Sequence, residues 1–172
     1  MLKPEIKKSA NIRNILLQDV QNRLLKIFID KGFVIFPLTP EEQKSTEIKN
    51  AFPLGRLKRV NGKKLEIVEI QFDKHGKTKF IINFGVVPEE GVILPWTRIE
   101  QNDADVSALS EAFRLYSRSI YPSWFEFGIL SEETEENVKK LVSKAIELYP
   151  EIETWFSTRV VGKHMRKFGF NL

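Results

Sequence analysis

Four polar side chains lie in segments that otherwise have the pattern of apolar β-strands: Glu69, Gln71, Asn83 and Arg98. Gln71 and Asn83 can share one face of adjacent antiparallel strands, where buried amides need hydrogen-bond partners. Arg98 can supply those partners, or it can present its planar guanidinium to a carboxylate or phosphate. Glu69 can pair with a basic residue across the sheet. The four residues form a candidate ligand-binding site, and the alternative interpretation is a structural polar network beneath a helix.

A second candidate site is a basic patch around the Asn61-Gly62 turn, without any acidic residue: Arg56, Lys58, Arg59, Lys63 and Lys64. Clustered cations neutralise phosphates, so this patch and the basic tail at 157–172 are candidates for nucleic-acid binding. Binding to single strands also needs exposed aromatic rings, and Phe72, Phe80 and Phe84 fall on apolar faces instead. The competing interpretation is a solvated basic hairpin.

No catalytic or metal-binding signature accompanies these candidates. The chain has no Cys, which excludes disulfides, thiol catalysis and iron–sulfur clusters. His75 falls in a turn and His164 in the basic tail, and no Gly-rich phosphate loop is present. We therefore assign no catalytic residue, no metal and no cofactor, and we favour a role other than that of an enzyme.

The size and composition of the chain fit one ordinary domain, which we expect to comprise residues 1–172. Hydrophobic residues make up 42% and charged residues 29% of the sequence, as in globular proteins. Residues 1–64 carry 14 basic and 6 acidic groups, a net +8, whereas residues 100–156 carry 5 and 12, a net −7. Such asymmetry indicates either a charged partner or segments that pair with each other in the fold.

The elements that position the polar residues are predicted from periodicity and turn signals. Apolar residues at three- and four-residue spacing predict a helix over about 11–31, which Gly32 is suited to end. Residues 33–36 have the pattern of a strand, and residues 40–50 that of a short surface helix or loop. Short turns then separate a series of further strands, over 54–60, 63–72, 78–87 and 92–100.

The second half of the chain is predicted to be mainly helical. One helix is expected over about 106–119, and a later one is expected to begin at Ser131 and to end or kink at Pro150. The predicted fold class is α+β, with an antiparallel meander of about four to six strands and helices packed mainly on one face. No segment is apolar enough to cross a bilayer, and residues 1–5 contain no apolar signal region, so we expect a cytoplasmic bacterial protein without membrane contact.

The order of several short motifs resembles that of a bacterial family. These motifs are Lys31-Gly32-Phe33 after the first helix, Arg56 in a strand, Ile70-Gln71, Asn83-Phe84-Gly85 and Trp96-Thr97-Arg98. Over residues 12–156 the chain is similar to the family catalogued as domain of unknown function 4304, and it adds residues 37–53 to that pattern. The resemblance implies a fold and the importance of Gln71, Asn83 and Arg98, and it implies no activity.

Three functional hypotheses follow from the sequence. The first is a non-catalytic binding domain, for example a toxin-neutralising immunity protein, which binds a protein partner through the acidic segment 100–156. The second is nucleic-acid binding through the basic hairpin 56–64 and the basic tail. The third is an enzyme of unrecognised type with a site near Glu69, Gln71, Asn83 and Arg98. An open pocket at these residues would favour the third hypothesis, and a closed network would leave surface recognition.

Overall fold

A mainly antiparallel sheet of seven strands forms the centre of the computed structural model, which describes residues 4–168, with side chains from residue 11 onward. The strand order is β1-β2-β3-β4-β7-β9, and β8 pairs with β4. The strands are β1 (Val34–Phe36), β2 (Arg56–Asn61), β3 (Lys64–Phe72), β4 (Lys79–Val87), β7 (Ala112–Leu115), β8 (Phe125–Glu126) and β9 (Met165–Phe168). This confirms the α+β class, with a sheet one strand larger than the upper expectation.

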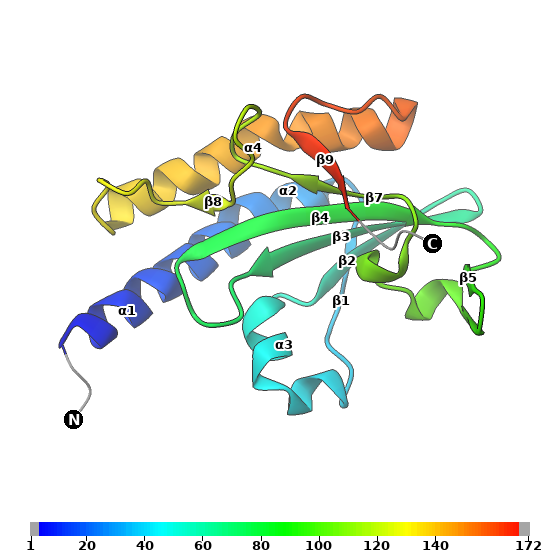
Figure 1. Cartoon of the computed structure of the whole chain (residues 1–172), viewed down its shortest axis with the longest axis horizontal. Helices are drawn as coiled ribbons and strands as arrows, with labels where there is room; N and C mark the ends of the chain where they lie inside the picture. The colour runs from blue at the N-terminus through cyan, green and yellow to red at the C-terminus, as the bar shows by residue number, and fades with distance from the viewer. Residues whose placement is uncertain (1–3, 169–172) are drawn as a thin grey trace.

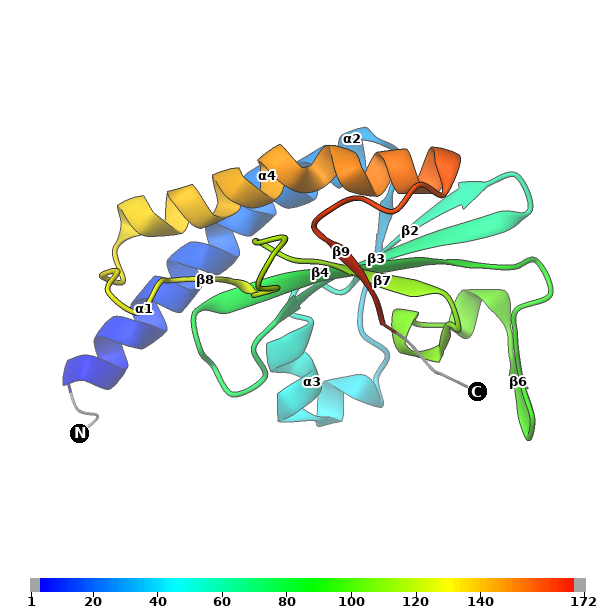
Figure 2. The same cartoon turned by 45° about the horizontal axis from the view of Figure 1, so that its top comes forward.

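The two long helical segments cover one face of the sheet, as predicted (Figures 1 and 2). The first is continuous through α1 (Pro4–Asp19), the π-helical segment η1 (Val20–Leu25) and α2 (Lys26–Asp30), and the second is α4 (Glu135–Thr158). The short α3 (Thr46–Ala51) lies on the other side of the sheet in Figure 2. The 3-10 turns are η2 (Glu42–Lys44), η3 (Gln101–Asp103) and η4 (Val106–Ala108).

The alternation of side chains along β3 divides the buried core between the two faces of the sheet. Val68 and Ile70 belong to the larger cluster beneath the long helices, whereas Ile67 belongs to a smaller cluster with Val106 on the opposite face. Aromatic rings fill much of the larger cluster, where the rings of Phe84 and Trp155 lie 5.3 Å apart in an edge-on arrangement. Such a pair adds about 0.5–1.5 kcal/mol beyond the burial of its area.

The first helix ends just before Gly32, as the sequence predicts, although the helix begins at Pro4 rather than near residue 11. Gly32 has a φ of 91°, its N–H donates to Ile29 O at 2.9 Å, and Phe33 N–H donates to Phe28 O at 3.1 Å. These two bonds form the Schellman motif that closes many helices. The turn directs the chain immediately into the predicted strand at β1.

The predicted hairpin between β2 and β3 is present, but its turn differs from the expected Asn61-Gly62 type. Asn61 pairs with Lys64, so the two central residues are Gly62 and Lys63. Gly62 has a φ of 62°, and Asn61 and Lys63 have negative φ. Only the first central residue therefore needs positive φ, as in a type II′ turn, which favours Gly at that position.

Residues 92–100 form a separate hairpin and not a single strand of the main sheet. Its strands are β5 (Val92–Leu94) and β6 (Thr97–Ile99), which pair only with each other within the described chain. Pro95 lacks the N–H that a continuing strand would donate, so the chain turns at Pro95 and Trp96. The hairpin extends beyond the main sheet (Figure 2), and it carries Arg98 away from β3 and β4.

Two helix predictions in the second half are wrong. Residues 106–119 form the short turn η4 and then β7, because Phe113 and Leu115 enter the sheet between β4 and β9. The last helix begins after Thr134, whose hydroxyl accepts a hydrogen bond from the Asn137 N–H at 3.2 Å, and not at Ser131. Pro150 lies inside α4, and the helix continues to Thr158.

We predict that Gly55→Ala destabilises the fold far more than Gly62→Ala. Both glycines have positive φ, but a Cβ at Gly55 would lie 2.4 Å from Phe36 O of β1, whereas a Cβ at Gly62 meets nothing within 4 Å. Both substitutions should cost about 1 kcal/mol for the backbone conformation. The clash at Gly55 should add about 1–3 kcal/mol. Urea unfolding of both variants checks this, and equal losses would contradict the close approach of β1 to Gly55.

Candidate functional site

The structure brings three of the four predicted polar residues together and separates the fourth. Glu69, Gln71 and Asn83 share the face of β3 and β4 that lies opposite the long helices. Arg98 lies on the separate hairpin, is exposed, and forms an ion pair with Glu100 at 3.4 Å. Arg114 of β7 occupies the role proposed for Arg98, because its Nε donates to Asn83 Oδ1 at 2.8 Å.

A row of polar side chains crosses the sheet on this face. Glu69 is paired with Asn83, Asn83 with Arg114, and Arg114 with Arg166 of β9. Arg56 of β2 adjoins the other side of Glu69, since Leu57 and Val68 are partners in the antiparallel register. Because these strands lie far apart in the sequence, the row can be recognised only from the register in which the strands pair.

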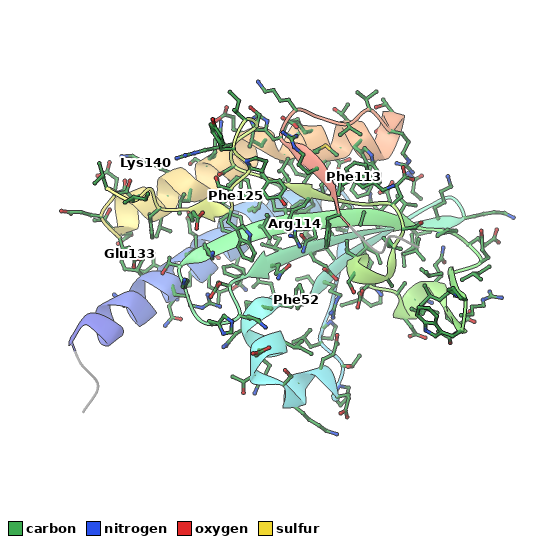
Figure 3. All side chains as sticks on the ribbon, in the orientation of Figure 1. Phe52, Phe113, Arg114, Phe125, Glu133 and Lys140 are labelled. Carbon is green, nitrogen blue, oxygen red and sulfur yellow. The ribbon has the colours of Figure 1, made fainter. Side chains whose placement is uncertain are left out.

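Hydrogen bonds close the middle of this row. Asn83 Nδ2 donates to Gln71 Oε1 at 2.8 Å, and the Arg114 guanidinium lies 4.0 Å from the centre of the Phe168 ring. Asn83 is only 1% exposed. Figure 3 shows Arg114 near the middle of the sheet. Buried amides with satisfied partners stabilise a structure, so this network supports the structural interpretation and lowers the support for an enzyme at these residues.

The basic hairpin is largely neutralised by carboxylates. Arg59 forms ion pairs with Glu66 at 2.6 Å and with Glu153 of α4 at 3.1 Å, and Lys63 pairs with Glu89 at 3.2 Å. Arg56 and Lys58 point inward on the same face of β2, and Lys64 is exposed. Paired cations attract phosphates less than free ones, so the patch offers less support for nucleic-acid binding than its composition indicates. Residues 169–172 of the basic tail lie outside the described residues.

Arg56 is the centre of a buried ionic cluster. Its Nε donates to Glu69 Oε1 at 2.9 Å, and its NH1 lies 2.7 Å from Glu42 Oε1. Burial raises the pKa of the Glu69 carboxyl above its usual value, Arg56 opposes this, and Asp105 adds to it. Glu69 also accepts the Val106 N–H at 3.3 Å. Glu69, flagged by the sequence, is therefore a structural partner of the basic patch.

The inserted segment 37–53 is held against this cluster by a capping box. Thr39 N–H donates to Glu42 Oε2 at 2.8 Å, and Glu42 N–H donates to Thr39 Oγ1 at 3.2 Å. This reciprocal pair is typical of a helix start, although only the short η2 follows it directly. Because Glu42 also pairs with Arg56, the segment lies beside β1 and β2 and forms walls of two hollows there.

The first hollow, which we name the apolar groove, lies on the helical side of β1. It has a volume of about 600 Å³ and is lined by Gln21, Leu25, Ile35, Pro37, Leu38, Gln43, Lys49, Phe52, Pro53, Leu54 and Gly55. Figure 3 labels Phe52, which lies at the end of α3. In the π-helical segment Val20, Leu24 and Leu25 are all buried, because its wider turn brings residues four and five apart to one side. This widening places Leu25 in the groove wall.

The second hollow, which we name the charged pocket, lies on the opposite face of β1. It has a volume of about 380 Å³ and is lined by Phe36, Pro37, Thr39, Glu42, Arg56, Lys58, Asn102, Asp103, Ala104 and Asp105. Lys58 is only 6% exposed, donates to Asn102 O, and lies 4.9 Å from the centre of the Phe36 ring. Burial, with Arg56 nearby, lowers the pKa of the Lys58 ammonium.

Between the two hollows lies β1, the edge strand of the main sheet. Its outer side pairs with no strand of the described chain, and Val34, Ile35 and Phe36 are 60%, 42% and 41% exposed. An edge strand presents unpaired N–H and C=O groups, and proteins usually protect such edges with charged side chains. No residue of β1 is charged. The strand is therefore open to pairing with another extended segment.

Other kinds of site find little support in the described residues. No group of His, Asp and Glu side chains between residues 4 and 168 is arranged to hold a metal ion. None of the helices that the structure describes is both long and apolar enough to span a membrane.

Comparisons with known proteins identify no relative of this chain. No family model matches it, and neither the curated proteins nor the solved structures contain a significant match. The resemblance to domain of unknown function 4304 therefore stays a prediction.

We predict that Arg56→Leu costs about 3–5 kcal/mol at neutral pH, because Glu69 then lies buried without its counter-charge. Because the pKa of the Glu69 carboxyl is raised in the folded state, this carboxyl stabilises the fold at low pH. That stabilisation is lost as pH rises from the pKa of about 4.3 in the unfolded chain through the pKa in the folded protein. Removal of Arg56 raises the folded pKa further. Urea unfolding at about pH 5 and pH 8 should therefore show the larger loss at the higher pH.

The double variant Arg56→Leu, Glu69→Leu is the control for this prediction. It removes both buried charges, so it should recover much of the lost stability and should abolish most of the added pH dependence. An Arg56→Leu variant that loses the same free energy of unfolding at both pH values would show that Glu69 is not the uncompensated charge.

Proposed function

We propose that this protein is a protein-binding domain that takes an extended segment of a partner protein as an added strand beside β1. The observation that carries the proposal is an uncharged, exposed edge strand with a hollow on each of its faces. Added strands obtain affinity from main-chain hydrogen bonds and specificity from pockets for alternate side chains. This is the protein-binding hypothesis from the sequence, with the surface moved from segment 100–156 to β1.

The two edges of the sheet support this location. At the opposite edge, β9 carries Arg166 and Lys167, which protect it from pairing with another strand. β1 has Val34, Ile35 and Phe36 at the equivalent places. One edge strand of the sheet is therefore protected by charged side chains, whereas the other edge strand, β1, is not.

Alternation fixes how a bound segment meets the two hollows. Successive side chains of a strand point to opposite faces of the sheet. Ile35 lines the apolar groove and Phe36 lines the charged pocket, and an added strand follows the same alternation. One side chain of the segment therefore enters the apolar groove and its neighbour enters the charged pocket. Complete burial of an aliphatic or aromatic side chain in the groove contributes about 1.5–3 kcal/mol.

A second copy of the chain fits the edge less well than a linear segment. β1 is three residues long and is followed by Pro37, which has no N–H to donate. Antiparallel self-pairing centred on Ile35 would place each Pro37 opposite Phe33 of the other copy, which limits the shared ladder. With a linear segment of another protein, a single proline, Pro37 of this chain, limits the ladder instead of two.

The acidic segment 100–156 offers a weaker surface because many of its carboxylates already have partners. Glu135 and Glu136 pair with Lys139 and Lys140 along α4, and Glu153 pairs with Arg59. Of these contacts, the Arg59–Glu153 pair joins the basic segment 1–64 to the acidic segment, in line with the interpretation in which the two segments pair with each other.

The proposal predicts that Ile35→Lys weakens peptide binding by about tenfold or more, because a charge then borders the groove in which an apolar side chain is buried. Peptides are first selected from a random linear library displayed on phage, with the whole chain as bait. Synthetic copies are then titrated calorimetrically into each variant. Ile93→Lys is the matched control, since Ile93 is also exposed but lies on the separate hairpin.

Three outcomes would count against a peptide-binding edge. These are a selection that enriches no peptide, enriched peptides that bind Ile35→Lys and Ile93→Lys equally, and amide signals that shift on binding elsewhere than in β1 and β2. A dimer that forms with rising concentration and that Ile35→Lys dissociates would assign the edge to a second copy of the chain.

A further inference from the structure

We infer that the charged pocket recognises the carboxamide side chain of an asparagine or glutamine in the strand bound beside β1. The inference rests on the proposed function and names one residue class of the partner segment. It depends on the buried ammonium of Lys58, on the carboxylates at the mouth of the pocket, and on the alternation of side chains across the edge strand.

Lys58 provides hydrogen-bond donors that the protein leaves unused. An ammonium carries three N–H donors, and Asn102 O is the acceptor that Lys58 reaches within residues 4–168. Lys58 as a whole residue is only 6% exposed, so few water molecules can replace the missing acceptors. Unused donors of a buried charge are costly, and an oxygen acceptor from a ligand would satisfy them.

Two aspartates provide the complementary acceptors. Asp103 is exposed at the mouth and forms no ion pair or side-chain hydrogen bond with the part of the chain that the structure describes. Asp105 Oδ1 accepts from Ser107 Oγ at 2.6 Å and from the Ala108 N–H at 3.1 Å, which leaves its other oxygen for a ligand. A group that enters the pocket thus meets a donor from Lys58 and acceptors from the aspartates.

The open donors and acceptors of the pocket favour a carboxamide. Arg56 is already bound by Glu69 and Glu42, so the open groups are the Lys58 ammonium on one side and the Asp103 and Asp105 carboxylates on the other. A lysine side chain has no acceptor for the Lys58 donors, and a carboxylate has no donor for the aspartates. A carboxamide supplies one oxygen acceptor and two N–H donors without adding charge.

A peptide selected against the whole chain provides the test. At the position that faces the charged pocket, the residue is changed in turn to Gln, Glu, Lys and Leu, and each peptide is titrated calorimetrically. The Gln peptide should bind about tenfold or more tightly than the other three, as expected for hydrogen bonds to charged groups. Lys58→Met and Asp103→Asn should each reduce that preference, and Glu133→Gln, at an exposed site on another surface, should leave it unchanged.

The results separate this inference from the proposed function. Equal affinity of the four peptides, or a preference for Lys, Glu or Leu, would overturn the carboxamide assignment while strand binding at β1 stands. A preference for Gln that survives both Lys58→Met and Asp103→Asn would show that another site reads the side chain. Failure to obtain any peptide that binds at β1 would contradict the proposed function itself.

Discussion

The interaction on which the arrangement depends is the buried contact of Arg56 with Glu69 and Glu42. It joins β2 to β3 and also joins β2 to the inserted segment 37–53. Buried ion pairs add little net stability, but the loss of one partner leaves an uncompensated charge, so the structure tolerates only the arrangement that keeps them together. That constraint places the segment beside β1, where it forms walls of both hollows. The contacts of Arg56 with Glu69 and Glu42 therefore stabilise both the sheet and the walls of the proposed binding edge.

Much of the fold could be predicted because the strands of the meander have period-two patterns with strong turn signals. The strands at 33–36, 63–72 and 78–87 and the helix that ends before Gly32 are present. The errors arose where a short apolar pattern has two solutions. The pattern of residues 112–115 is compatible with a helix or a strand, and the segment is a strand because it pairs with β4 on one side and with β9 on the other. Similarly, the pattern of residues 92–100 predicts one strand, whereas the structure forms a separate hairpin that turns at Pro95 and Trp96.

The candidate site was less predictable, because its parts come from distant segments. The sequence marked Glu69 and the basic hairpin separately, and the structure makes Glu69 and Arg56 one ionic cluster. Arg114 was missed because its strand was assigned to a helix, so its place beside Asn83 could not be deduced. The hollows depend on where segment 37–53 folds, and its sequence predicted a short helix or loop but not its contact with Arg56.

The length of β1 bears on how an exposed edge can coexist with a stable sheet. A short edge strand offers few main-chain hydrogen bonds, which limits indiscriminate pairing with other chains. Main-chain bonding alone would then give weak affinity, so specific binding requires additional contributions from side chains. The apolar groove and the charged pocket provide these on the two faces of the strand. Selectivity at this edge would therefore come from the segments around β1. The inserted segment supplies most of the wall of the apolar groove, and β2 with residues 102–105 supplies most of the wall of the charged pocket.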